Sequence, residues 1–223
     1  MTYLPPLTEL DSDGAIQEYA EKVDSATRAA FLRKAGVIGG AVVAGGAFAG
    51  SFPALAGAAT PKSDVDILNF ALTLEFLEAE FYTLAVASNF ANPEHNLFAK
   101  VVKAHEVAHV KALQAALGSA AVPKPKFDFG DTVTDQGKFA GTAQVLEDTG
   151  VAAYLGQAGL IKTKAILAAA GSILPVEARH AAWIRNINGG KPPATNPAPF
   201  AFEKPKTKAQ ILAAVAKTGF IVG

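Results

Sequence analysis

Residues 176–185 read VEARHAAWIR, and within them Glu177 and His180 are separated by two residues. The same Glu-x-x-His spacing occurs earlier in the chain, at Glu106 and His109. Side chains three residues apart lie on one face of a helix, so each pair presents a carboxylate and an imidazole in the same direction. The two pairs predict a helical protein in which ligand-type side chains are turned toward one another.

Each pair follows a glutamate that has a tyrosine seven residues after it, Glu75 with Tyr82 and Glu147 with Tyr154. The distance from this glutamate to the glutamate of the following pair is 31 residues in one half and 30 in the other. The two halves therefore repeat, and a bundle with pseudo-twofold symmetry would gather six side chains at mid-height. These candidate metal ligands are Glu75, Glu106, His109, Glu147, Glu177 and His180.

The candidate ligands interrupt apolar stripes whose members recur every three or four residues. A single glutamate on a helix is usually solvated, and each of these alone would be interpreted as a surface residue. Four on stripes that face a core are different, because an unpaired buried carboxylate costs several kcal/mol. The facing stripes contain no Lys or Arg to pair with them. The pattern therefore predicts a metal site, in which four carboxylates would neutralise the charge of two divalent ions and the imidazoles would add nitrogen ligands.

Apolar periodicity predicts four helices joined by a short, a long and a short connection. We expect them from about Asp64 to Ser88, Pro93 to Leu117, Gln136 to the high 160s, and Ser172 to Gly189. Ser63 is expected to cap the first helix, and Pro175 to lie in the first turn of the fourth. Residues 118–135 lack helical periodicity and form the long link. A long crossover between the second and third helices is typical of a ferritin-like four-helix bundle, so the expected fold class is all-α.

The bundle is expected to span residues 60–190. A Pro-rich tail follows over residues 191–223, and its stretch KTKAQILAAVAKTGF (206–220) predicts a short amphipathic helix across one end of the bundle. Residues 1–59 form a separate segment that precedes the bundle.

Residues 1–59 combine an acidic start with the features of an export signal. Residues 35–61 carry no charge, follow basic residues within 28–34, and contain an A-x-A sequence at 54–56. Basic residues, a mildly apolar stretch and a small-residue cleavage site are typical of an exported protein. The segment predicts a protein of the periplasm or cell envelope whose mature chain begins near Gly57.

The basic part of this segment reads TRAAFLRKAG over residues 27–36, which resembles the twin-arginine export motif, with Ala29 in place of the second arginine. The alternative is a retained membrane anchor, because about 20 apolar residues can span a bilayer. The many glycines between Gly36 and Gly57 make the stretch a poor spanning helix.

Composition excludes several other classes of site and partner. The chain has no cysteine, which excludes disulfides and thiolate metal sites. Its formal net charge is zero and no basic stripe is evident, so nucleic acid is not an expected partner. An envelope protein or a second copy of the chain is the expected macromolecular partner, if there is one.

Three stretches resemble the ferritin-like superfamily, and within it the ferritin-like domains grouped with desiccation-related proteins. They are DVDILNFALTLEFLEAEFY (64–82), VLEDTGVAAYLGQ (145–157) and VEARHAAWIR (176–185). The resemblance covers about residues 63–189 and extends weakly to the C-terminal helix.

The resemblance implies a dinuclear site in which Glu106 and Glu177 bridge two Fe ions or, alternatively, two Mn ions. The remaining ligands would be Glu75 and Glu147, binding one ion each, completed by His109 and His180. Tyr82 and Tyr154 are expected to hydrogen bond toward the carboxylates, and Asp148 is a candidate to orient a ligand histidine.

Two neighbouring residues are set apart from this set. Glu78 lies one turn after Glu75 and is an alternative ligand, but it lacks the tyrosine at the matching spacing. His105 lies about 100° around the helix from Glu106 and is expected at the rim of the site.

The leading functional hypothesis is an exported redox protein that reacts with O2 or peroxide, oxidising Fe(II) or removing peroxide under oxidative or desiccation stress. A first alternative is a dimanganese catalase in which Glu177 is the catalytic acid and base. A second is a non-enzymatic envelope protein with a structural or stress-protective role.

Overall fold

The computed structural model describes residues 60–189 and 196–222. The expected leader, the alternative anchor and the cleavage site fall in residues 1–59, which lie outside the described residues. Among the helices that are described, none is both long enough and apolar enough to cross a membrane.

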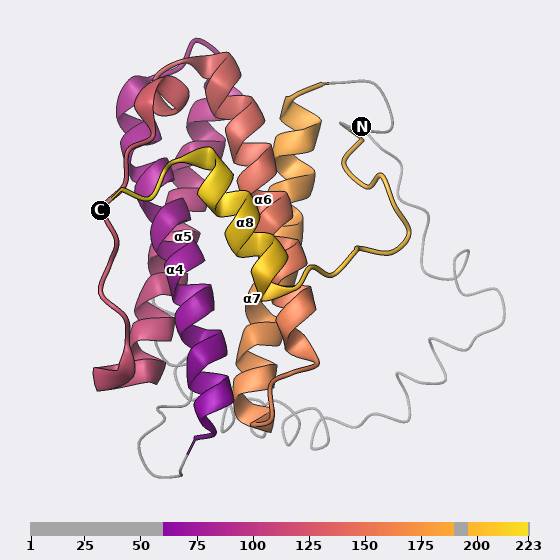
Figure 1. Cartoon of the computed structure of the whole chain (residues 1–223). Coiled ribbons are helices and arrows are strands. Elements are labelled where there is room, and N and C mark those ends of the chain that lie inside the picture. The colour runs from indigo at the N-terminus through magenta and orange to yellow at the C-terminus, as the bar shows by residue number, and fades with distance from the viewer. Residues whose placement is uncertain (1–59, 190–195, 223) are drawn as a thin grey trace, which may run out of the picture. The chain divides into compact units, whose positions relative to one another are not determined.

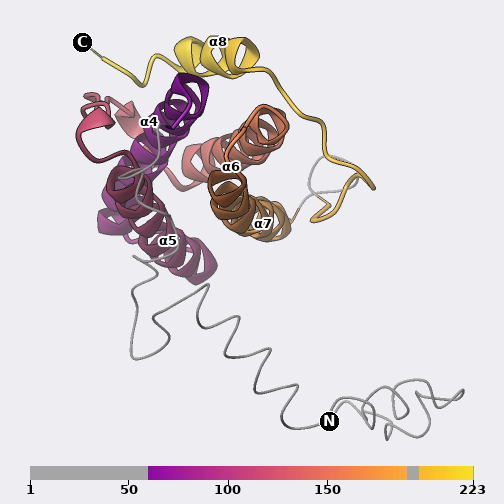
Figure 2. The ribbon, with the colours of Figure 1, turned by 90° about the horizontal axis from the view of Figure 1, so that it is seen from below.

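Four long helices form the bundle: α4 (Lys62–Ala85), α5 (Pro93–Leu117), α6 (Gln136–Ala158) and α7 (Lys164–Ile187). Helix α4 packs mainly against α5, and α6 mainly against α7. Seen along the bundle in Figure 2, the two pairs stand beside each other. The expected all-α, ferritin-like bundle is confirmed.

The link between α4 and α5 is short and specified locally. A single 3-10 turn, η1 (Val86–Ser88), ends at Asn89, whose backbone is left-handed with φ 46°. The Asn92 side chain then accepts a hydrogen bond of 2.9 Å from the Glu94 amide and caps α5, which has Pro93 in its first turn. These local signals explain why the expected bounds of α5 match the structure.

The long crossover runs back along the bundle from the end of α5 to the start of α6 (Figure 1). It contains two short 3-10 turns, η2 (Gly118–Ala120) and η3 (Gly130–Val133). The Asn69 side chain of α4 holds its beginning, donating to the Ala120 carbonyl at 2.9 Å and accepting from the Val122 amide at 2.8 Å. Farther along, Phe127 forms an isolated antiparallel bridge with Ile221.

Helix α7 begins eight residues before the expected start at Ser172, and α6 ends at Ala158 instead of the high 160s. The reason is tertiary: the buried carboxylate of Asp64 on α4 accepts hydrogen bonds from the Lys162 and Thr163 amides, at 3.1 and 2.9 Å, where α7 starts.

Two further local expectations are wrong. Helix α4 begins at Lys62 with Pro61 as its cap residue, so Ser63 lies inside the first turn instead of capping it. Pro175 lies in the interior of α7, and the carbonyl of Gly171 that it leaves unpaired is on the exposed side of the helix.

The expected C-terminal helix is present as α8 (Lys208–Thr218), but it lies on the side of the bundle across α4 and α6 and not across one end (Figures 1 and 2). It starts with a capping box between Thr207 and Gln210 and buries Ile211 and Val215. The chain before α8 approaches α6 closely, because the Lys206 amide donates to the Ala152 carbonyl at 3.1 Å.

The buried core consists of two apolar clusters, one toward each end of the four helices. One contains Phe81, Phe98 and Phe139, and the other contains Leu72 and Ile166. On α5 and α7 the buried Glu106 and Glu177 fall between residues of the two clusters, and on α4 and α6 apolar residues of both clusters flank Glu75 and Glu147. The apolar layers therefore enclose a polar layer at mid-height.

Candidate metal centre

The structure brings the six candidate ligands together in two overlapping groups. In each group, four residues offer ligand atoms that all lie within 4.8 Å of one another. The first group is Glu75, Glu106, His109 and Glu177, and the second is Glu106, Glu147, Glu177 and His180. Glu106 and Glu177 belong to both groups, which is the arrangement that two ions sharing two carboxylates require.

The two histidines direct the same ring atom toward the carboxylates. Nδ1 of His109 lies 3.2 Å from Glu75 Oε2, 3.1 Å from Glu106 Oε2 and 3.2 Å from Glu177 Oε1. Nδ1 of His180 lies 3.1 Å from Glu106 Oε1 and 3.2 Å from Glu147 Oε2. Each imidazole therefore meets the carboxylates of its own group through one nitrogen and leaves Nε2 for another contact.

The carboxylates are buried without enough hydrogen bond donors. Glu75, Glu106, Glu147 and Glu177 have no exposed surface. Glu177 Oε2 accepts no hydrogen bond among the described residues, and Glu106 Oε1 and Glu177 Oε1 have near them only the Nδ1 atoms of His180 and His109, which other carboxylates share. Buried polar atoms are normally paired, so one oxygen without a partner and two that share an imidazole nitrogen with other carboxylates indicate a missing electropositive partner.

Gly150 on α6 provides room for these oxygens. A Cβ atom at this position would lie 3.1 Å from Glu177 Oε2 and 3.5 Å from Glu78 Oε1. The absence of a side chain therefore lets the carboxylates approach the α6 backbone closely. The under-paired oxygens, the glycine and the mixed oxygen and nitrogen donors together are compatible with a dinuclear metal site.

The two tyrosines bond across the halves of the bundle. The Tyr82 hydroxyl on α4 donates to Glu147 Oε1 on α6, and the Tyr154 hydroxyl on α6 donates to Glu75 Oε1 on α4. Both tyrosines are buried. The expected hydrogen bonds toward the carboxylates are present, and each connects a tyrosine to the glutamate of the other half rather than to its own helix.

The crowding of carboxylates shifts their pKa values in opposite directions. Burial raises the pKa of Glu75 to about 7, and burial together with Glu106 holds the pKa of Glu177 well above its usual range. At Glu106, hydrogen bonding to His109 and His180 outweighs burial and lowers the pKa. Without bound metal, this cluster therefore retains protons at carboxylates that would be ionised in water.

The histidines respond to the same carboxylates. Burial alone would lower the pKa of His180, but Glu106 and Glu147 raise it to about 10. Glu75 and Glu106 likewise outweigh burial and raise the pKa of His109. Metal binding needs neutral imidazole, so cations entering the cluster would displace protons from both rings.

Glu78 is also buried, with 3% of its surface exposed, although it belongs to neither group of four. Burial and the neighbouring Glu177 hold its pKa well above the usual range. Its carboxyl group adds a fifth buried glutamate to the polar layer and remains an alternative ligand.

Asp148 does not have the contact expected of it. Its carboxylate pairs with the Arg185 guanidinium and not with a ligand histidine. Asp148 follows Glu147 by one residue, which turns it about 100° around α6 and away from the cluster. The interpretation that Asp148 orients a histidine is wrong.

His105 makes the contact that was expected from Asp148. Its Nδ1 lies 2.8 Å from His180 Nε2, and the two rings stack with centroids 5.1 Å apart. Burial and His180 lower the pKa of His105, so the neutral ring can accept the Nε2–H of His180. The available signal was its spacing of four residues from His109, which places both on one face of α5.

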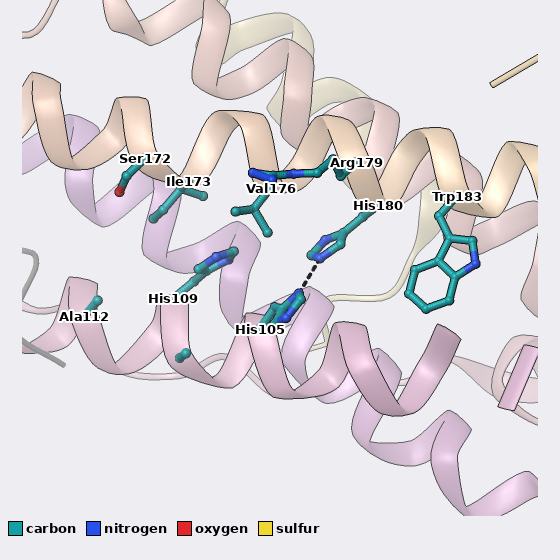
Figure 3. A pocket seen from close by; sticks show the side chains of 10 residues that line it. His105, His109, Ala112, Ser172, Ile173, Val176, Arg179, His180 and Trp183 are labelled. Atoms are coloured by element: carbon teal, nitrogen blue, oxygen red, sulfur yellow. Dashed lines mark hydrogen bonds between the residues drawn. The ribbon is translucent and has the colours of Figure 1, made fainter. Parts of the chain in front are cut away.

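A cavity of about 520 Å³ adjoins the cluster between α5 and α7. Figure 3 shows His105, His109 and His180 in its wall, with Trp183 at one end and Ser172 at the other. His105 and Arg179 in its lining are exposed, so among the described residues the cavity connects the buried His180 with the surface.

The bundle, its crossover and the buried carboxylate–histidine cluster define a protein of the ferritin-like class. Residues 63–190 match the family described as ferritin-like domain, which is more than half of the chain. The chain therefore belongs to that family. No curated protein matches it.

Proposed function

We propose that the cluster binds two Fe ions, or alternatively two Mn ions, and that the protein is an oxidoreductase acting on O2 or peroxide. The observation that carries this proposal is the sharing of Glu106 and Glu177 by both four-residue groups. These two carboxylates are fully buried, and three of their oxygens have no hydrogen-bond donor beyond the shared Nδ1 atoms of His109 and His180. Four carboxylates would neutralise the charge of two divalent ions, which makes the buried cluster electrostatically balanced.

The remaining ligands divide evenly between the two ions. Glu75 and His109 would hold one ion, and Glu147 and His180 the other. A bound pair of redox-active ions supplies two electrons to an O–O bond. Hydrogen bonds fix the positions of the ligands. Tyr82 and Tyr154 hold the two glutamates that would each bind one ion, called the terminal glutamates, and His105 holds His180 through Nε2.

Glu177 supports catalysis of the catalase type as a second candidate function. Its Oε2 is without a hydrogen bond among the described residues, and burial and Glu106 hold its pKa well above the usual range. A carboxyl group with these properties can hold a proton near neutral pH and return it, as an acid and base must. In this candidate, Glu177 exchanges protons with peroxide instead of bridging the ions.

The sequence supports an exported location. The leader features of residues 1–59 and the resemblance to desiccation-related proteins favour a protein of the periplasm or cell envelope that acts in oxidative or desiccation stress. Mass spectrometry of the protein isolated from its native envelope tests this location, with a start near Gly57 expected. An intact residue 1 would support the retained anchor.

The proposed function is tested by loading the full chain with Fe(II) or Mn(II) under anaerobic conditions and measuring metal per chain. We expect about two ions, because two ligand groups share the bridging carboxylates. The Glu106→Ala variant should lose the pair, whereas Glu94→Ala, an exposed glutamate on the same helix, should keep it. A wild-type ratio near zero would contradict the proposal.

Activity then separates the candidates. Fe(II)-dependent O2 consumption would support an Fe(II)-oxidising enzyme, and peroxide removal by the Mn form would support a catalase. A protein that binds two ions but has neither activity would support the structural alternative.

A further inference from the structure

We propose that the cavity between α5 and α7 is a binding site for a small organic acid with an apolar body. If the proposed function is correct, this molecule would be a co-substrate of the metal pair, and only that role rests on the proposed function. Binding itself can be tested on the metal-free chain.

The size and lining of the cavity fit a small organic molecule. Its volume of about 520 Å³ lies within the range of roughly 300–1,000 Å³ found for such sites. Most of its wall is apolar, formed by Ala108, Ala112, Ile173, Val176 and Trp183. An apolar wall favours an aliphatic or aromatic body, and a metal ion or a peroxide molecule would use little of it.

The charges around the cavity favour an anion. Outside the buried cluster, Glu94 is the only acid on α5 and α7, and it lies in the first turn of α5. The same two helices carry several cations, and Arg179 is the one that lines the cavity. Its Nε donates to the Pro175 carbonyl at 2.9 Å, which holds the guanidinium beside Val176 in Figure 3. A carboxylate is the group that a guanidinium binds best, so we assign the acid group of the ligand to Arg179.

The position of the cavity connects the ligand to the cluster. His109 and His180 line its wall while their Nδ1 atoms face the buried carboxylates. An occupant would therefore lie on the outer side of the two imidazoles, opposite the glutamates. This arrangement places an organic molecule next to the metal ligands without requiring it to displace them.

The single tryptophan provides the measurement. Trp183 is the only tryptophan of the chain and lines the cavity, so tryptophan emission comes from one residue in contact with the site. Metal-free full-length protein is titrated with decanoate, with 1-decanol as the neutral match and decyltrimethylammonium as the cationic one. We expect a saturable change in emission, with decanoate binding about tenfold more tightly than decanol because of one charge-assisted contact.

Two pairs of variants locate the ligand. Arg179→Ala should weaken decanoate binding about tenfold, and Lys164→Ala, which removes an exposed cation at the start of the same helix, should leave it unchanged. Ala108→Phe should fill the cavity and abolish binding, whereas Ala104→Phe, on an exposed position one turn away, should not. Thermal melts confirm that each variant is folded.

Each contrary result overturns a defined part of the inference. Equal binding of decanoate and decanol, unaffected by Arg179→Ala, would overturn the assignment of an acid. No saturable change, or binding that survives Ala108→Phe in a folded variant, would overturn the site. Metal analysis of the same preparation keeps the two proposals distinct: two ions without decanoate binding contradicts this inference alone, and decanoate binding without metal uptake contradicts the proposed function alone.

Discussion

The Tyr82 hydroxyl on α4 donates a hydrogen bond to Glu147 on α6, which belongs to the other half of the sequence repeat. The Tyr154 hydroxyl on α6 donates the equivalent hydrogen bond to Glu75 on α4. Each half therefore positions the terminal glutamate of the other half. The two helix pairs are joined through the candidate ligands themselves, and the geometry of the cluster depends on how the pairs pack.

These two hydrogen bonds between the halves predict that each tyrosine affects the affinity of one of the two metal positions. Tyr82→Phe should lower the affinity for the ion at Glu147 and His180, and Tyr154→Phe should lower the affinity for the ion at Glu75 and His109. Each decrease should be about 10- to 100-fold, which is the usual effect of removing a group that orients a ligand. Mn(II) titration followed by electron paramagnetic resonance measures both affinities. Each variant is the matched control for the other, and equal weakening of both ions by either change would contradict independent control.

Removing the shared carboxylates separates metal binding from folding. The double variant Glu106→Ala with Glu177→Ala should bind almost no metal. Its metal-free form should be at least as stable as metal-free wild type, because the change removes mutual repulsion between buried carboxylates. The free energy of unfolding of wild type with Mn(II) should be higher than that of both metal-free forms, by about 4 kcal/mol when the Mn(II) concentration is a thousand times Kd.

Thermal melts of wild type and double variant, each with and without Mn(II), provide the comparison. If only the metal-free double variant unfolds, the two glutamates are structural partners of the histidines, and the metal hypothesis is wrong.

The stability of the metal-free protein should fall as pH rises from about 6 to 9. The folded-state pKa of Glu75 is raised from 4.5 to about 7, and that of His180 from 6.5 to about 10. A group with a raised pKa stabilises the folded state below its unfolded pKa, and this contribution is lost as pH passes the folded value. The stabilisation from Glu75 is therefore lost between pH 4.5 and about pH 7, and the stabilisation from His180 between pH 6.5 and about pH 10.

Melting temperatures across this range in the presence of a chelator measure the effect. The double variant is the control, since Glu106 is one of the two residues that raise the pKa of His180. Its dependence on pH should be weaker than that of wild type. A melting temperature of metal-free wild type that rises toward pH 9 would contradict the assignment.

Gly156 determines whether the C-terminal tail can lie on α6. A Cβ atom there would fall 1.9 Å from the Lys206 carbonyl oxygen, which cannot be accommodated without moving the backbone. Gly156→Ala should lower the free energy of unfolding by about 1–3 kcal/mol. It should also speed tryptic cleavage after Lys206 as the tail is displaced.

Gly141→Ala on the same helix is the control, because no atom lies within 4 Å of a Cβ at that position. This exposed helical glycine should gain about 0.5–1 kcal/mol when replaced by alanine. Chemical denaturation of the two variants checks the opposite signs. Equal behaviour of the two would show that the tail does not depend on Gly156.

The sequence by itself determined the features that arise from local spacing. The Glu-x-x-His pairs and the tyrosines seven residues after Glu75 and Glu147 identified the polar layer, because helical periodicity fixes which side chains share a face. The start of α5 followed from a local cap and proline, and the single long crossover followed from residues 118–135. These signals predicted the bundle and the residues that meet in its centre.

Only the tertiary structure decided how the helices meet. Asp64 on a distant helix accepts hydrogen bonds from the backbone amides just before α7, so the sequence near Ser172 could not indicate where α7 begins. Likewise, Asp148 pairs with Arg185, and His105 replaces it beside His180. The cavity depends on the separation between α5 and α7. Each of these features depends on the packing of helices far apart in the chain, and local periodicity carries no information about it.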